Sequence, residues 1–200
     1  MADLVPQNFP IPQETAIASY DFVDISEGVG TVRYVGSRIQ VDATSGNDEF
    51  ILTTKTDIIG QEVSGEFKTE IGASNEFNFD VTFNTPKTVD GRIMGFIPIE
   101  NAASTSATPR VRILKWDGSS ETELVAQVTY QATPGTNGNY VSAVAIDTSN
   151  EKFKAGETLR IEVVITAASN VHLQHDPTGS ISASPSGGIL SWLVPFKLDL

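Results

Sequence analysis

Strict alternation of apolar and polar residues is the feature that most constrains how this chain can fold. In residues 76–84, EFNFDVTFN, apolar side chains stand two positions apart with polar ones between them. Successive side chains of an extended strand point to opposite faces, so this pattern predicts a strand with one buried face. The expected buried positions are Phe77, Phe79, Val81 and Phe83.

The same alternation recurs in three later segments, TELVAQVTY, TLRIEVVIT and SWLVPFKLDL, and predicts three more half-buried strands. In the last segment Pro195 removes one backbone donor, which indicates an edge strand or a bulge at that point. The expected buried positions are Leu124, Ala126, Val128 and Tyr130; Leu159, Ile161, Val163 and Ile165; and Trp192, Val194, Phe196, Leu198 and Leu200.

Short strands separated by turn residues fill the rest of the chain from residue 31 onward. Turn-forming residues gather at 117–120, 133–139, 147–157 and 176–188, and no run of twelve residues keeps a period of 3.6. We therefore expect an all-β fold, an antiparallel, jelly-roll-like β-sandwich of about twelve strands formed by residues 31–200. The further strand candidates are residues 31–35, 38–42, 49–54, 61–71, 92–99, 110–116, 140–146 and 171–175.

Residues 1–30 differ from the rest and are expected to form an extended N-terminal arm. Prolines at positions 6, 10 and 12 remove backbone donors and favour extended conformations over a central strand. The segment is also more apolar than a freely solvated tail needs to be. It either lies on its own domain or docks on a neighbouring subunit, and we favour the second. The arm residues expected at that interface are Leu4, Val5, Phe9, Ile11 and Ile17.

Composition excludes several function classes. Thirteen Lys and Arg against 25 Asp and Glu give a net charge of −12, so nucleic acid is not expected as a partner. The absence of cysteine excludes disulfides, thiolate metal sites and cysteine nucleophiles. We expect no membrane span and no Sec export, because neither a long apolar run nor a signal-peptide pattern is found.

The segment VHLQHDPTG, residues 171–179, holds both histidines and an aspartate, and so raises the question of a metal or acid–base site. In a strand, His172 and His175 are an odd number of positions apart and point to opposite faces, which disfavours one shared metal. The DPTG sequence that follows is typical of a type I turn. We expect a strand running into a turn; if either histidine is functional, it is His175, at a loop or subunit contact.

Two acidic loops and the aromatic residues leave binding alternatives open. Residues 42–50 carry Asp42, Asn47, Asp48 and Glu49, and residues 147–151 with Glu157 form a similar set, so either loop could hold calcium, although neither has EF-hand spacing. Trp116 and Trp192 could stack on sugars, but both lie in alternating segments, where burial in the core or in a subunit contact is the favoured prediction.

Catalytic motifs are not evident. The sequence contains neither a Gly-x-Ser-x-Gly elbow nor a convincing Ser/His/Asp set, and no pair of carboxylates stands out. We therefore expect no cofactor and no enzymatic activity. A hydrolase is kept only as a third alternative, which would need a pocket with converging carboxylates.

Four segments resemble virion structural proteins of tailed bacteriophages, of the jelly-roll decoration, cement or fibre-base type: VRILKWDGSSETEL, FKAGETLRIEVVI, HDPTG and the ending WLVPFKLDL. The resemblance implies a virion location, a capsid-associated role and no catalytic residues. We expect a homo-oligomer, a trimer or larger, that also contacts other virion proteins such as a major capsid protein. His175, Trp192 and Phe196 join the arm residues as interface candidates. The alternative is a carbohydrate-binding β-sandwich module of a phage fibre or secreted enzyme, with a glycan as partner.

Overall fold

The computed structural model describes residues 18–19, 29–40, 48–54, 68–71, 75–102, 104–167, 170–175 and 188–197. In these residues the chain forms twelve strands and no helix, so none of them provides a helix long and apolar enough to cross a membrane. The strands are β1 (Ala18–Ser19), β2 (Val29–Gln40), β3 (Asp48–Thr53), β4 (Lys68–Ile71), β5 (Asn75–Thr82), β6 (Lys87–Asn101), β7 (Ala107–Trp116), β8 (Glu121–Thr129), β9 (Gly138–Phe153), β10 (Thr158–Ala167), β11 (Val171–Gln174) and β12 (Ser191–Lys197).

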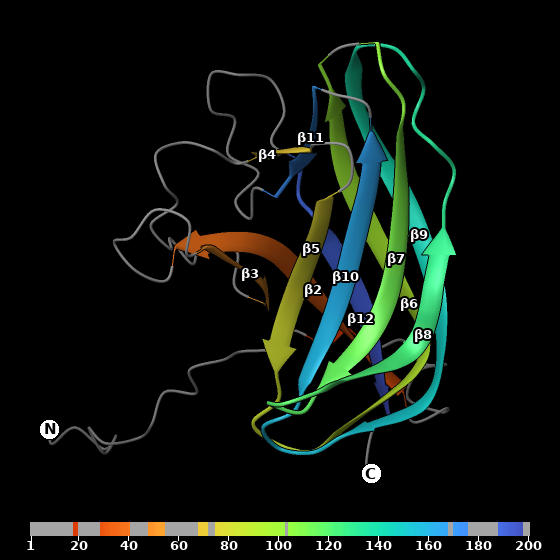
Figure 1. The fold of residues 1–200 in the computed structure, drawn as a ribbon. Coiled ribbons are helices and arrows are strands. Elements are labelled where there is room, and N and C mark those ends of the chain that lie inside the picture. The colour runs from red at the N-terminus through yellow and green to blue at the C-terminus, as the bar shows by residue number, and fades with distance from the viewer. Residues whose placement is uncertain are drawn as a thin grey trace, which may run out of the picture.

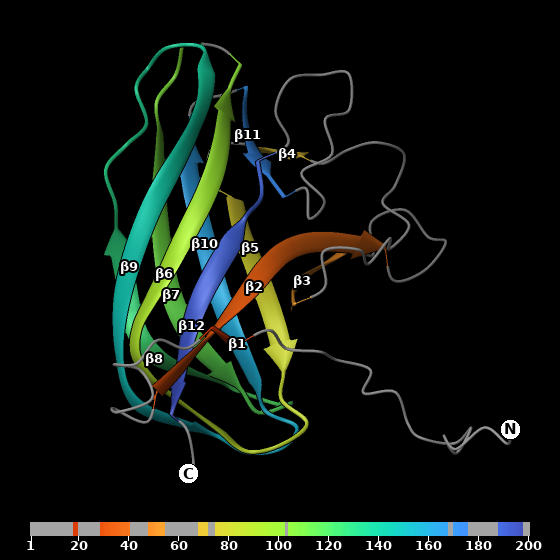
Figure 2. The same cartoon turned by 180° about the vertical axis from the view of Figure 1, so that it is seen from behind.

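The strands lie in two facing layers, and the all-β sandwich predicted from the sequence is confirmed. In Figure 1 the front layer consists of β5, β10, β7 and β8, with β6, β9 and β12 behind it. Figure 2 shows the back layer from its outer side, where β9, β6, β12 and β2 lie side by side. The hydrogen-bonding order agrees, since β5–β10–β7–β8 are consecutive neighbours and β9–β6–β12–β2 are consecutive neighbours.

The long strand β2 links the two layers. Its first half pairs with β12, and its second half, from Val35 to Gln40, pairs with β3, which in turn meets β5 through one parallel pair. Figure 2 shows the curvature of β2 between these partners. Gly36 lies where the pairing changes, and a Cβ there would overlap the Leu190 side chain. The sequence-based expectation of two separate strands here, at 31–35 and 38–42, is therefore replaced by one bent strand.

The N-terminal side of β2 bears on the predicted arm. Strand β1 lies within the predicted arm and pairs with Thr31 and Val32 of β2, just beyond it. Strand β2 itself begins inside the predicted arm, at Val29. The five apolar arm residues named above lie outside the described residues, as do Leu198 and Leu200 at the other terminus.

The core lies between the layers and follows the predicted alternation closely in β5, β10 and β12. All four predicted positions of β10 are fully buried, and in β5 Phe77, Phe79 and the following Phe83 are at most 5% exposed. Aromatic rings meet edge to face across the core; Phe83 lies 5.1 Å from Phe153 and 5.7 Å from Phe196 between ring centroids. Such edge contacts are the arrangement that aromatic rings prefer.

Two strands depart from the predicted alternation. In β8 the pairing with β7 shifts register twice, so that Val125 packs against the core. Ala126 is exposed and Val128 is 38% exposed, which contradicts the predicted burial of both. In β12 the register to β6 shifts between Leu193 and Phe196. Pro195 therefore marks a bulge, as one of the two predicted possibilities, but in a central strand flanked by β2 and β6 and not at an edge.

The indole of Trp192 packs against Gly95 of the neighbouring strand β6, to which it is directly paired. A Cβ at position 95 would overlap the six-membered ring of Trp192 and come within 2.7 Å of Val144 Cγ2. Trp192 is fully buried, so the ring cannot move aside into solvent.

We expect Gly95→Ala to lower the free energy of unfolding by about 1–3 kcal/mol, because overpacking a dense core forces side chains off their preferred rotamers. Urea unfolding followed by tryptophan fluorescence measures the change. Combining Gly95→Ala with Trp192→Leu should recover part of the loss, since the two residues are in contact and their effects are not additive. Purely additive losses would contradict the proposed contact.

Candidate functional site

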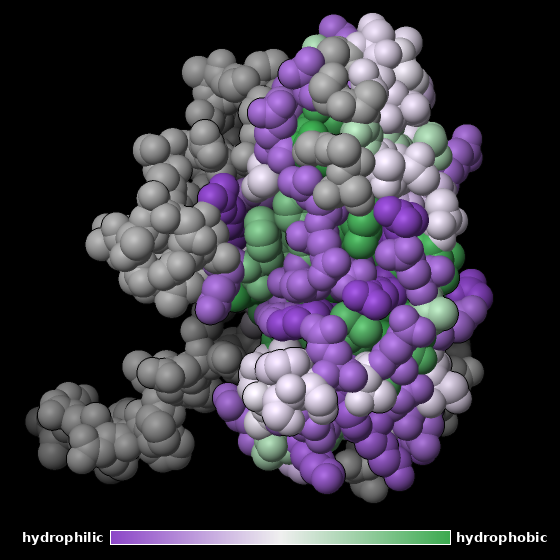
Figure 3. Space-filling model, viewed as in Figure 1, coloured by the Kyte–Doolittle hydropathy of each residue, from purple (hydrophilic) through white to green (hydrophobic). Residues whose placement is uncertain are grey.

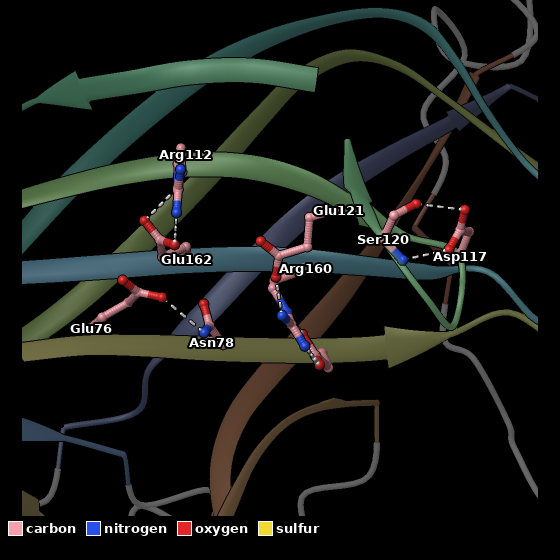
Figure 4. A network of polar contacts seen from close by, with 9 residues as sticks. Glu76, Asn78, Arg112, Asp117, Ser120, Glu121, Arg160 and Glu162 are labelled. Carbon is pink, nitrogen blue, oxygen red and sulfur yellow. Dashed lines mark hydrogen bonds and ion pairs between the residues drawn. The ribbon is translucent and has the colours of Figure 1, made fainter. Parts of the chain in front are cut away.

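The outer face of the front layer carries a network of ion pairs that crosses four strands. Arg160 of β10 binds Asp80 of β5 through two hydrogen bonds of 2.8 and 2.7 Å and also contacts Glu121 of β8. Arg112 of β7 binds Glu162 of β10 through bonds of 2.6 and 2.5 Å. Figure 4 shows these pairs side by side, and Figure 3 shows that the same face is mostly hydrophilic.

Each of these arginines lies directly opposite its carboxylate in the sheet register: Arg160 pairs with Asp80, and Arg112 pairs with Glu162. Opposite residues of antiparallel strands bring their side chains within a few ångströms, so register alone places the partners in reach. Leu114 lies on the same outer face yet is only 2% exposed. We attribute this to the aliphatic parts of the long charged side chains, which cover apolar surface while their heads stay in water.

Glu162 is the most unusual ionisable group of this face. It is 1% exposed. Burial disfavours its charged form, and the nearby Glu76 carboxylate repels it; together they raise the pKa of Glu162 above its ordinary value, against the opposing effect of Arg112. Asn78 donates a 3.1 Å hydrogen bond to Glu76 Oε1, which holds the second carboxylate in this position. Two carboxylates and a guanidinium thus share one region of the face.

A tight turn and a tryptophan close one end of the network. Asp117 Oδ1 accepts hydrogen bonds from the backbone N–H groups of Ser119 and Ser120, both 2.8 Å, and these bonds lower the pKa of Asp117 well below its usual range. Gly118 has a φ of 96°, so the predicted Asp-Gly turn is confirmed. Trp116 just before it is half-buried, and the Arg160 guanidinium lies 5.5 Å from its ring centroid, within cation–π range.

The outer face of the back layer is different, because its centre is apolar. Met94 and Phe96 of β6 are 41% and 39% exposed, and Val141 of β9 is 65% exposed. The register joins them: Met94 is opposite Leu193 of β12 on one side and Ala145 of β9 on the other, and Phe96 is opposite Ala143. We call this surface the back-face patch; it consists of Met94, Phe96, Val141, Ala143, Ala145 and Leu193.

The two histidines do not form a joint site. His172 lies on β11 with its Nδ1 3.7 Å from Glu100, whereas His175 is fully buried, accepts or donates a 2.9 Å hydrogen bond with Thr69 Oγ1, and packs edge to face on Phe50. Their separation agrees with the strand geometry expected from the sequence. The DPTG turn after them lies outside the described residues.

The predicted interface residues at the C-terminal end lie inside their own chain. His175, Trp192 and Phe196 are 0%, 0% and 7% exposed, and the last two belong to the hydrophobic core. Contact with a partner stays a prediction for this end of the chain, but these side chains have almost no exposed surface for it. Their alternation marked them as apolar, and burial in the same chain already accounts for that.

The acidic loops bring no three ligands together among the residues that the structure describes. Residues 42–47 of the first loop lie outside that part. The second set was expected in a turn at 147–157, but residues up to Phe153 belong to strand β9, so that part of the prediction is wrong. There the exposed carboxylate of Asp147 binds Arg92 through bonds of 2.7 and 3.1 Å, and this pair lowers the pKa of Asp147. Glu157 accepts a 2.7 Å hydrogen bond from the Lys154 backbone N–H, so it closes a turn.

Sequence reasoning did not find either outer face. The ion pairs join residues up to 80 positions apart, and only the register shows that they are opposite one another. For the back-face patch one signal was available: in residues 92–99 apolar residues occupy consecutive positions and not only alternate ones, which is typical of a strand that is apolar on both faces.

We expect Glu162→Gln to change how stability depends on pH. The pKa of Glu162 is raised in the folded chain, so the wild type loses stability as pH rises from below the ordinary value of 4.5 through the raised value. The variant lacks this titration, so its stability relative to the wild type should improve as pH rises. Urea unfolding across this pH range measures the difference.

The control is Glu123→Gln, which removes a half-exposed carboxylate 3.8 Å from the same arginine and so reports the loss of a charge beside Arg112 without the loss of a buried one. If the free energies of unfolding of the wild type and Glu162→Gln differ by the same amount at every pH, the raised pKa is contradicted.

Comparison with known proteins gives no family: no family model matches the chain, and no curated protein matches it. Solved structures give distant likenesses. A CocE/NonD family hydrolase from Staphylococcus aureus has 12% identity and a TM-score of 0.38, over 94% of this chain and 36% of that one. The enzymatically active domain of a bacteriophage CBA120 tailspike protein has 9% identity and a TM-score of 0.37, over 82% of this chain and 18% of that one. A family 16 carbohydrate-binding module has 13% identity and a TM-score of 0.29, over 79% of this chain and 85% of that one.

This chain therefore spans about a third of the length of the hydrolase and about a fifth of the tailspike domain that it resembles. The prediction that the chain is not an enzyme is corrected by these likenesses, because they include a hydrolase and an enzymatically active domain. At such identities and TM-scores no functional residue of those proteins is transferred to this chain. The similar structures do include a phage tailspike domain and a carbohydrate-binding module, which agrees with the coarse resemblance predicted from the sequence.

Proposed function

We propose that this protein is a virion structural protein: a capsid-associated subunit of the decoration, cement or minor-capsid kind that assembles with copies of itself. The observation that carries the proposal is the back-face patch. In a chain of net charge −12, three large apolar side chains lie 39–65% exposed on neighbouring strands. Covering contiguous apolar surface removes it from water and gains free energy, which is why we place the proposed contact on this patch.

Assembly would use the N-terminal arm and the edge strands. Among the described strands, β9 pairs only with β6 and β8 pairs only with β7, so each has one edge without a strand partner. The edge strand β8 carries the charged side chains of Glu121 and Glu123. Charges on an edge strand oppose pairing with a strand of another chain. The middle of β9, residues 140–146, carries no charged side chain, so this stretch of its edge is the better site for addition of a strand from a neighbour. The partners proposed are a homo-oligomer, a trimer or larger, and virion proteins such as a major capsid protein.

The patch is tested with Met94→Glu combined with Phe96→Glu. Charges placed on an apolar contact must be desolvated, so we expect association of the full chain to weaken at least about tenfold, equivalent to 1.4 kcal/mol. Val128→Glu is the control for each single variant, Met94→Glu or Phe96→Glu, since it places one glutamate on another exposed apolar residue, 38% exposed, outside the patch. Sedimentation over a concentration series measures association, and equal behaviour of patch and control variants would contradict the proposal.

Virion association is measured separately, by mass spectrometry of purified particles for this protein. Its presence at stoichiometric amounts supports the proposed location, and its absence from particles of a virus that expresses it contradicts that location.

Glycan binding is the second candidate, and the surroundings of Trp116 favour it. A half-buried indole beside Asp80, Glu121 and Arg160 combines an apolar ring with convergent polar groups, which is how small-molecule sites orient a ligand. Against it, the Arg160 guanidinium already lies over the ring. On a glycan array, a specific signal that is lost in Trp116→Ala but kept in Trp192→Phe would support this candidate, and an array without any specific signal would count against it.

A further inference from the structure

The back-face patch has definite ends. At one end Arg92 and Asp147, directly opposite each other on β6 and β9, form an exposed ion pair. At the other end Glu100 of β6 is opposite Asn139 of β9 and lies near His172. Between these polar pairs lie the outward-facing residues of the patch, which are Met94 and Phe96 of β6, Leu193 of β12 and the alternate residues of the stretch 141–145 of β9. Its outline is therefore set by charged and polar residues on both ends.

The size of the patch indicates what kind of partner fits it. Five residues of a strand extend about 17 Å, and three neighbouring strands cover about 10–15 Å, which gives on the order of 200 Å². A stable contact between two folded proteins needs about 800 Å² from each partner. The patch alone is too small for two sandwiches to associate face to face. A single extended peptide segment of about five residues, however, matches both its length and its width.

The chain contains such a segment before β1. Residues 1–17 include Leu4, Val5, Phe9 and Ile11, together with prolines at 6, 10 and 12 that favour an extended conformation. Phe9 and Ile11 are two positions apart, so where the segment is extended as a β-strand they point to the same side. A proline-containing segment has fewer backbone donors to satisfy, and it therefore suits a face whose own backbone groups are already paired within the sheet.

Reach and charge agree with this occupant. The segment joins β1, which pairs with β2 at Thr31 and Val32, and β12 and β6 follow as the next strands. From β1 to β6 is three strand spacings, about 14 Å, whereas the seven residues from Ile11 to Ala18 extend up to about 24 Å. Along the sequence Glu14 lies between the apolar residues and β1; in space the exposed Arg33 of β2, opposite Leu193, lies between the patch and β1.

We propose that the back-face patch binds the N-terminal segment, residues 1–17, with Phe9 and Ile11 on Met94 and Phe96 and with Glu14 near Arg33. Every copy of the chain has the same patch and the same segment, so either its own segment or that of a neighbour can occupy the patch. The exchange between neighbours rests on the proposed function, because it is the step by which the arm would hold subunits together.

The composition of the chain allows a direct test in the full-length protein. It has no cysteine and only two methionines, Met1 and Met94, so a spin label can be attached at one engineered cysteine and the Met94 methyl group observed by NMR. With the label on Asn8→Cys, we expect the paramagnetic form to lose most of the Met94 methyl intensity that its reduced form shows. Full retention of that intensity would overturn the proposal.

The control keeps the label and changes only the proposed anchors. Adding Phe9→Ser and Ile11→Ser to the labelled chain should restore the Met94 signal; broadening that persists would overturn the role of these two residues. The substitutions lie in residues 1–17, before β1, so they should not disturb the sandwich. Unchanged signals from the rest of the chain verify that each variant is folded.

A mixture of two differently labelled chains shows whether the docked segment comes from the same chain or from a neighbour. Isotope-labelled unmodified chain is mixed with spin-labelled chain at natural abundance; broadening of Met94 there supports docking from a neighbour, as in the proposed assembly. Broadening only when both labels are on one chain supports docking within the chain and counts against arm exchange. If neither sample broadens, the docking proposal fails, while the virion role is still decided by particle mass spectrometry.

Discussion

The contact between the Trp192 indole and Gly95 is the interaction on which the rest of the back layer depends. It places the largest side chain of β12 inside the core, directly opposite a residue without a side chain. Once Trp192 points inward, Leu193 must point outward, because successive residues of a strand alternate between faces. Leu193 then meets Met94 and completes the apolar surface of the back layer. One buried contact therefore fixes both the core and the outer face.

The two outer faces of the sandwich satisfy the same physical requirement in opposite ways. On the front, arginines pair with carboxylates from neighbouring strands, and these charge-assisted bonds use the polar groups of the face internally. Glu162 adds little net stability by this pairing, since a buried charge loses hydration before it gains a partner. On the back, the central residues carry no charge and their apolar area stays in contact with water. The back face therefore gains free energy when its apolar centre is covered.

The sequence predicted the fold better than it predicted the site, and the reason is the range of the interactions. Alternation is local, so strands such as 158–167 and their buried residues could be identified from neighbouring letters alone. The bulges of β8 and the bend of β2 depend on partner strands and were missed. Ion pairs such as Arg160 with Asp80 need a register across 80 positions. The buried His175 looked exposed because the sequence after it reads as a turn.

The net charge of −12 bears on the proposed assembly, because the patch is so small. Copies of an acidic protein repel one another, but at physiological salt that repulsion is screened beyond about 8 Å. Two sandwiches pressed face to face would bring many carboxylates within that distance for on the order of 200 Å² of apolar contact. A narrow segment that crosses between them buries the same apolar area while the folded bodies stay apart. Charge and patch size together therefore favour assembly through an extended arm over assembly through flat faces.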